Sequence, residues 1–167
     1  MAISMYQASA PVFDRMLGNL EAILAKAAAW AAERKIDPAV LLASRLAPDM
    51  FPCTRQLQIA CDFGKNTCAR LAGLDPPKFE DNETSISEFQ ARISKTRAYI
   101  ATLGAAQIDG SEERQIRFKA GSREMEFKGL PYLTGYALPN FYFHYTMAYA
   151  ILRHNGLGLV KSDYIGG

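Results

Sequence analysis

The sequence predicts a mainly helical protein, a four-helix bundle with a short β-hairpin between its third and fourth long helices. Apolar residues recur every three or four positions in four long segments, which is the period of an amphipathic helix. The period changes to two only between Ile116 and Lys128. The chain has 167 residues, 49% of them hydrophobic and 22% charged, which is typical of one folded domain. We therefore expect a single helical bundle domain over residues 1–167.

The first long helix is expected from about Pro11 to Arg34, in a segment rich in Ala, Leu and Met. Pro11 suits the first turn of a helix, where the N–H that proline lacks is not needed. The apolar residues at helical spacing are Phe13, Leu17, Leu20, Leu24 and Ala28. Between Ile36 and Phe51 two prolines interrupt the pattern. This predicts a connector that contains a short helix.

The second long helix is expected from Pro52 to about Leu74, again with proline at the first position. Its inner positions alternate by four and three: Leu57, Cys61, Gly64, Cys68 and Leu71. Several of these side chains are unusually small. They permit close approach of neighbouring helices or leave a cavity.

The third long helix is expected to begin after Ser85, because Ser85 and Glu88 have the spacing of a capping box. It reaches about Leu103, and its inner face is formed by Phe89, Ile93, Thr96 and Ile100. A hairpin follows, with basic residues alternating along one strand and acidic residues along the other. The charged positions are Arg117 and Lys119, then Glu124 and Glu126. Since a two-stranded ribbon is only marginally stable alone, we expect it to lie against the helices.

The fourth long helix is expected within Gly129–Leu152, a run without Asp, Glu, Lys or Arg. The run is long enough to span a bilayer, but its prolines, Asn140, His144 and tyrosines make a membrane span the weakest interpretation. Its aromatic residues are distributed all round the helix, which predicts burial on every side. In a single four-helix bundle each helix normally keeps an outward face. We therefore expect a second copy to cover this face, giving a homodimer through the fourth helix.

Charge and cysteine content restrict the partners and the compartment. Nineteen Lys and Arg against seventeen Asp and Glu leave a net charge of +2, too little for the broad basic field of a nucleic-acid-binding protein. The three cysteines, Cys53, Cys61 and Cys68, are odd in number and form no CxxC pair, which argues against disulfides and a zinc knuckle. The first residues do not have the pattern of a secretory signal. We expect a cytoplasmic protein with no nucleic-acid or membrane partner.

Four stretches resemble a bacterial family of unknown function in the DinB/YfiT-like superfamily of metalloenzymes: MYQASAPVF, DPAVLLASRLAPDMFP, RQLQIACDFGKNTCARLAG and PNFYFHYTMAYAILRHNG. The resemblance covers essentially the whole chain, and the last stretch is its most specific part. It implies an up-down-down-up four-helix bundle that is often dimeric. In the better-known members three histidines bind a divalent metal, one on the second helix and two, four residues apart, on the fourth. Some of those members are metal-dependent thiol transferases or hydrolases.

The sequence reproduces only part of the histidine triad that this resemblance implies. His144 matches the second histidine of the fourth-helix pair, but Asn140 stands four residues before it. In the corresponding part of the second helix stand Cys61 and Asp62, whose thiolate or carboxylate could compensate as metal ligands. His154 cannot complete the site, because ten residues of helix place it about 15 Å further along and on another side.

Helical spacing also predicts the surroundings of these candidates. His144 shares a stripe that should face the bundle core with Leu133, Ala137, Phe141, Ala148 and Ile151. A lone core histidine is more often satisfied by a carbonyl, tyrosine or carboxylate than by a metal. Asp62 shares a face with Gln58 and Lys65, a polar pattern that predicts a solvated surface.

The leading hypothesis is an uncharacterised DinB-like bundle with a degenerate metal site and a small-molecule pocket near His144. The candidate pocket residues are His144, Asn140, Cys61, Asp62 and Tyr136. No catalytic residue is assigned, and neither a cofactor nor a bound metal is expected. One alternative is a metal-dependent transferase or hydrolase in which His144 binds zinc or nickel. The other is a non-catalytic dimeric scaffold.

Overall fold

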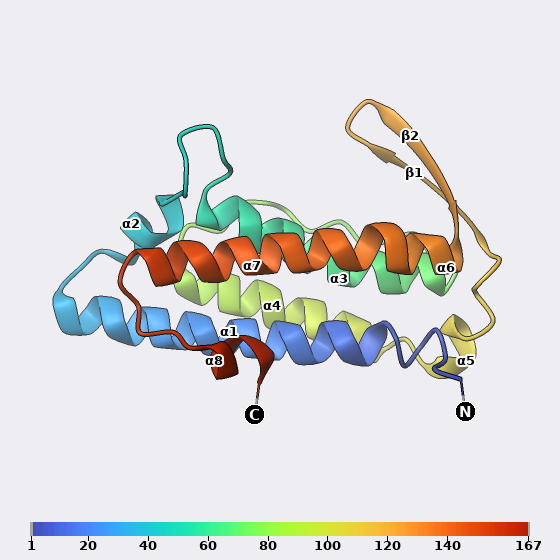
Figure 1. Cartoon of the computed structure of the whole chain (residues 1–167), viewed down its shortest axis with the longest axis horizontal. Helices are drawn as coiled ribbons and strands as arrows, with labels where there is room; N and C mark the ends of the chain where they lie inside the picture. The colour runs from blue at the N-terminus through green and yellow to red at the C-terminus, as the bar shows by residue number, and fades with distance from the viewer. Residues whose placement is uncertain (1, 167) are drawn as a thin grey trace.

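The computed structural model describes residues 2–166 and contains the expected four-helix bundle (Figure 1). Its long helices are α1 (Ala10–Arg34), α3 (Cys53–Leu71), α4 (Ile86–Ala101) and α7 (Leu138–His154). Helix α3 packs against α7 and α4, and α1 packs against α4. In Figure 1, α1 and α7 run in one direction while α3 and α4 run in the other. The order is therefore up-down-down-up, and a long crossover between α3 and α4 returns the chain along the bundle.

Shorter elements connect or flank these helices. They are α2 (Pro38–Ala43), α5 (Ala105–Ile108), α6 (Gly129–Pro131) and α8 (Lys161–Ile165). The short helix predicted in the connector is confirmed as α2, and the side chain of Asp37 caps its first turn. Pro52 precedes α3 instead of opening it.

Helix α3 ends earlier than expected because a Schellman motif closes it. The backbone N–H of Leu74 donates to the Ala69 carbonyl and that of Gly73 donates to the Arg70 carbonyl. Gly73 has a φ of 76°, a left-handed conformation in which glycine has no steric penalty.

The inner faces predicted for the second and third long helices are confirmed. Leu57, Cys61 and Cys68 of α3 are fully buried, as are Phe89, Ile93 and Thr96 of α4. The capping box that begins α4 is present, since the Ser85 hydroxyl accepts from the Glu88 N–H and the Glu88 carboxylate accepts from the Ser85 N–H. These contacts depend on residues close in sequence or on a simple apolar period, which is why the sequence could predict them.

The predicted hairpin consists of β1 (Gln115–Ala120) and β2 (Arg123–Lys128), paired antiparallel. Arg117 forms an ion pair with Glu126 at 2.8 Å across the strands. The rings of Phe118 and Phe127 contact Tyr132, with centroids 5.7 and 6.0 Å away. The turn, in contrast, projects away from the helices (Figure 1). Only one end of the hairpin therefore lies against the bundle.

The predicted fourth helix is interrupted near its start. Residues Tyr132–Ala137 form a π-helical segment between α6 and α7. Pro139 follows shortly after it, and a proline within a helix removes one backbone hydrogen bond and crowds the carbonyl four residues earlier. A wider π-helical turn relieves this crowding. Helical periodicity alone does not reveal this local widening.

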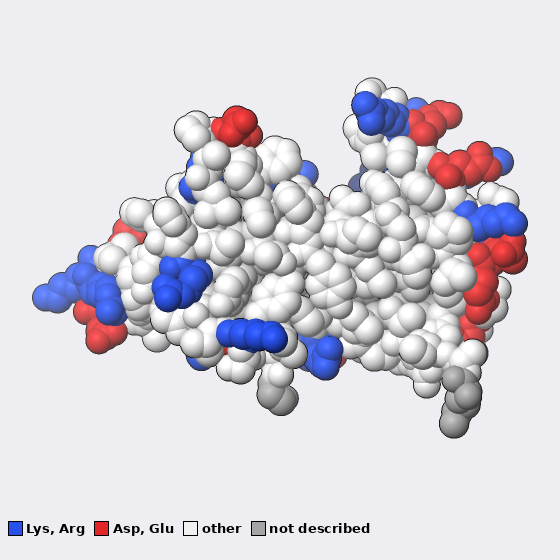
Figure 2. Space-filling model, in the orientation of Figure 1, with Lys and Arg blue, Asp and Glu red and all other residues white. Residues whose placement is uncertain are grey.

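Helix α7 carries an extended uncharged surface. In Figure 2 the surface along most of α7 is white, and the coloured side chains lie mainly near the margins. Phe143 of α7 is 52% exposed. In a single chain this face is open to solvent, so burial of the helix on all sides requires the second copy that is expected from the sequence. Within residues 2–166, no helix combines the length and apolarity needed to cross a membrane.

Candidate functional site

His144 lies on the side of α7 that faces α3, and Gln56 fixes its tautomer. The Nδ1 atom of His144 is 2.7 Å from Oε1 of Gln56. The amide nitrogen of Gln56 donates to the Phe51 carbonyl oxygen at 3.2 Å, which orients the amide oxygen towards the histidine. An amide oxygen only accepts hydrogen bonds, so Nδ1 carries the proton. The other ring nitrogen, Nε2, then presents a free lone pair.

Aromatic rings and burial keep this imidazole neutral. Phe63 stacks nearly parallel to the His144 ring, with centroids 6.1 Å apart, and Phe143 meets it edge-on at 5.2 Å. Burial, together with the nearby positive charge of Arg55, lowers the pKa of His144 to about 4. Nε2 makes no hydrogen bond within residues 2–166 and is not among the buried unpartnered atoms there, so solvent reaches it.

The stripe that contains His144 is only partly a core stripe. Leu133, Phe141 and Ala148 are fully buried, as expected. His144 itself is half-buried. It lies at the margin of the core, although its partner Gln56 is buried. The sequence offered no signal for this partner, since an isolated glutamine at a buried helical position has no distinctive pattern.

Asn140 and Tyr136 lie on the same helical run as His144 but make other contacts. The amide nitrogen of Asn140 donates to the Tyr136 carbonyl at 2.7 Å, which turns it onto its own helix. The Tyr136 ring contacts Phe63 at 5.8 Å and Phe127 of the hairpin at 5.2 Å. The structure thus joins Tyr136 to His144 through the ring of Phe63.

Cys61 and Asp62 lie on the α4 side of α3 and are not brought to His144. The Cys61 thiol is fully buried next to Thr96, and this burial raises its pKa to about 12. Asp62 forms ion pairs with Arg92 at 3.1 Å and with Lys65 at 3.3 Å. The interpretation that these two residues complete a site with His144 receives no support from this arrangement.

The residues around His144 do not fit the metal centre that the superfamily implies. Within the described chain, no three His, Cys, Asp or Glu side chains are grouped so that they could hold a metal ion. His144 is surrounded by an amide and aromatic rings. The Cys61 thiol is protonated at neutral pH, and the amide of Asn140 is engaged with its own helix. A divalent metal prefers deprotonated thiols, imidazoles or carboxylates in one cluster.

A buried ion-pair network on α3 and α4 was missed by the sequence analysis. Lys65 is 3% exposed, although a solvated face was predicted for it and for Gln58. The crossover between α3 and α4 covers this face, and the Lys65 ammonium donates to the Pro77 carbonyl at 2.5 Å. Arg92, whose side chain is 2% exposed, pairs with Glu83 at 2.7 Å and with Asp81 at 2.9 Å. The prediction failed because the covering segment is distant from α3 in sequence.

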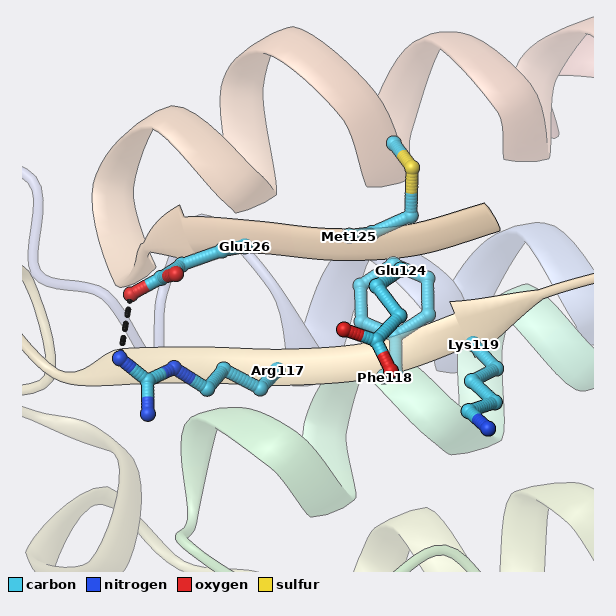
Figure 3. Close-up of a pocket in the computed structure, with 6 residues that line it drawn as sticks. All are labelled: Arg117, Phe118, Lys119, Glu124, Met125 and Glu126. Carbon is cyan, nitrogen blue, oxygen red and sulfur yellow. Dashed lines mark hydrogen bonds and ion pairs between the residues drawn. The ribbon is translucent and has the colours of Figure 1, made fainter. Parts of the chain in front are cut away.

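Four hollows on the described surface lie away from His144. One of about 470 Å³ is on the hairpin, where Phe118 and Met125 are flanked by charged side chains and the Arg117–Glu126 pair spans the strands (Figure 3). Two others, of about 570 and 360 Å³, adjoin Phe79 of the crossover. The fourth, of about 380 Å³, lies between the end of α3 and β1. His144 lines none of these four hollows, so the small-molecule pocket expected beside it is not among them.

Comparisons with known proteins agree with this fold. Residues 5–165 match a family model described as a domain of unknown function, DUF1993. The crystal structure of a DinB family member protein from Shewanella denitrificans is similar, with a TM-score of 0.87 and 40% sequence identity. The similarity covers 97% of this chain and 92% of that chain. None of the curated proteins used for comparison matches. The chain belongs to the DUF1993 family of unknown function and has a DinB-like bundle fold.

Proposed function

We propose that this DinB-like protein binds a small molecule at His144 and does not use a metal there. The observation that carries the proposal is the fixed neutral tautomer, in which Gln56 holds Nδ1–H and leaves the Nε2 lone pair open to solvent. Such a nitrogen accepts a hydrogen bond from a hydroxyl or amide group. The exposed ring of Phe143 beside it favours a ligand with an apolar or aromatic body.

The protonation of His144 provides the first test of this geometry. The folded pKa is about 4, below the ordinary value of 6.5. Between these two values the unfolded chain binds more protons, so the free energy of unfolding should fall as the pH decreases from about 6.5 to about 4. Nitrogen-detected NMR of labelled histidine should show an Nδ1–H tautomer at pH 7. The variant His154→Gln removes the signals of the other histidine.

A Gln56→Leu variant serves as the control for the tautomer. It removes the acceptor from Nδ1, so the two tautomers should become mixed while the chain remains folded. A protonated His144 at pH 7 in the unmodified protein would contradict the proposed site.

Ligand binding can be tested with phenol as the probe. Phenol combines a hydroxyl donor with an aromatic ring, whereas anisole has a similar ring but no donor. We expect phenol to shift the Nε2 resonance of His144 at lower concentration than anisole does. In His144→Phe the two compounds should bind equally. Equal binding to the unmodified protein would overturn the proposal of a hydrogen bond to Nε2.

A metal-dependent activity is the weaker alternative, because the side chains around His144 are an amide and aromatic rings and not metal ligands. Under our proposal, adding zinc to the protein purified without a nickel column leaves the Nε2 resonance unchanged. Zinc bound at one ion per chain, and lost in His144→Ala, would instead identify a metal ligand and refute the proposal.

The uncharged face of α7 favours an alternative proposal, that the protein is a homodimer and acts as a scaffold, with Phe143 in the contact between the two copies instead of against a ligand. A two-fold contact brings identical surfaces together, so a face without charges avoids like-charge repulsion. We expect light scattering to give twice the 18.5 kDa mass of the chain. Phe143→Glu should restore the monomer by placing like charges across the contact, whereas Lys161→Glu on α8 should not. A monomer at micromolar concentration would refute the dimer.

We also propose a cytoplasmic location. Cys53, Cys61 and Cys68 are all free and buried in the structure. Unpaired cysteines are typical of compartments in which thiols are kept reduced.

A further inference from the structure

Two arginines at the end of α3 and the start of the hairpin have guanidinium groups that no carboxylate neutralises. Within residues 2–166, neither Arg70 nor Arg114 forms an ion pair. Arg70 donates one hydrogen bond, to the Tyr132 hydroxyl at 3.0 Å, and its guanidinium stacks over the Phe118 ring at 4.0 Å. Arg114 donates to the Leu71 carbonyl. Each guanidinium has five N–H groups, so most of them remain available.

The end of helix α3 accounts for one hydrogen bond of Arg114 and for none of Arg70. Basic residues often lie at helix C-termini because they pair with the last carbonyl groups. Here the carbonyls of Cys68, Ala69 and Arg70 already accept backbone N–H groups of the Schellman motif. Arg114 satisfies only the next carbonyl, that of Leu71. The guanidinium of Arg70 therefore bonds to the tyrosine and not to the helix end.

Both arginines line the same hollow of about 380 Å³. Gly73 allows Arg114 to approach closely, since a Cβ on this glycine would lie 3.1 Å from the Arg114 Nη1 atom. Arg117 adds a third positive charge to the lining, although it is paired with Glu126. Asp75 is the one acidic residue among those that line it. The remaining lining includes apolar residues, among them Leu74, Pro76 and Phe118.

We propose that this hollow binds the oxyanion group of a small organic phosphate or carboxylate. Arg70 and Arg114 donate hydrogen bonds to the oxyanion, because planar guanidinium groups match the geometry of carboxylate and phosphate oxygens. The stacking of Arg70 on Phe118 and its bond to Tyr132 hold one of the two donors in place before the ligand arrives. The apolar lining accommodates the organic part of the ligand. The site is separate from His144 and does not depend on the function proposed for it.

Phenyl phosphate and benzoate are suitable probes, because they carry the two oxyanions on the same ring. Binding is measured by calorimetry at constant ionic strength, with neutral benzamide for comparison. We expect one or both anions to bind and benzamide not to bind. The anion that binds more tightly identifies the ligand as a phosphate or a carboxylate. Arg114→Gln should weaken binding about tenfold, the effect of losing a charge-assisted hydrogen bond. Asp75→Asn should strengthen binding about threefold, because it removes a negative charge from the lining.

Lys119→Gln is the matched control, since it removes the same charge from the hairpin but from a residue that lines a different hollow. It should change binding by less than about twofold. Arg70→Gln also removes the stacking on Phe118, so its fold is checked by circular dichroism before binding is measured. Absence of binding of both anions at about 10 mM, equivalent to a binding free energy weaker than about −3 kcal/mol, would overturn the proposal. Equal losses in Arg114→Gln and Lys119→Gln would also overturn it, because they would indicate general charge attraction.

Discussion

Replacing Arg92 with methionine is expected to lower the free energy of unfolding by about 3 kcal/mol. The Arg92 side chain is 2% exposed and pairs with Asp62, Asp81 and Glu83. It also donates to the Glu80 carbonyl at 2.9 Å, so one side chain fixes the crossover to both α3 and α4. Methionine fills a similar volume but leaves three carboxylates without their common cation. The loss should lie at the lower end of the range for buried pairs, because Asp62 and Asp81 are partly exposed.

Arg97→Met on the same helix is the matched control. Arg97 pairs with Asp14 at 2.8 Å and with Glu21 at 3.2 Å, but its side chain is 36% exposed. Solvent screens such pairs, so this variant should lose about 1 kcal/mol or less. Urea unfolding followed by circular dichroism measures both variants. If both lose the same free energy, the crossover does not depend on Arg92.

The contrast between Arg92 and the helix cores shows what could be predicted from the sequence. The inner face of α4 follows from an apolar period, which is a local property of the chain. The burial of Lys65 depends on Pro77 and its neighbours in the crossover, and no periodic pattern relates these two segments. Up-down-down-up order makes a long crossover necessary, but helical spacing does not reveal which polar face it covers.

The candidate site could be predicted only in part, because its remaining features depend on packing between segments distant in sequence. His144 stood out because it is the one histidine in the run Gly129–Leu152, which has no Asp, Glu, Lys or Arg. Its tautomer depends on Gln56 and the Phe51 carbonyl, which are ordinary residues in sequence and acquire a role only through packing. Cys61 and Asp62 were candidates only because the superfamily resemblance implies a metal ligand on the second long helix. By the helical period, Cys61 lies about 140° round α3 from Gln56 and about 160° from Phe63. Asp62 lies about 120° from Gln56 and about 100° from Phe63, and it pairs with Arg92 of α4.

Gly129→Ala is expected to lower the free energy of unfolding by about 3 kcal/mol, the upper part of the range for overpacking. Gly129 is buried where β2 meets α6, and the backbone of Ser111 and Glu112 crosses it there. A Cβ at this position would overlap the carbonyl oxygen of Ser111. A backbone carbonyl cannot rotate away as a side chain can. The adjacent hydrogen bond from the Leu130 N–H to the Glu112 carbonyl, at 2.9 Å, further restricts relaxation.

The displacement caused by this methyl group should reach the hairpin, because Gly129 directly follows β2. Phe118 and Arg114 would then shift relative to Arg70, so phenyl phosphate or benzoate binding should weaken together with stability. Gly135→Ala provides the control, since the added Cβ would meet no atom within 4 Å beyond the adjacent residues and the backbone of its own helix. Alanine is favoured over glycine in helices, so this variant should be as stable as the unmodified protein or more stable by up to about 1 kcal/mol. Thermal and urea unfolding measure the stability of both variants. If Gly129→Ala were as stable as the unmodified protein, the backbone at Gly129 could move away from that of Ser111 without cost, and the prediction would be wrong.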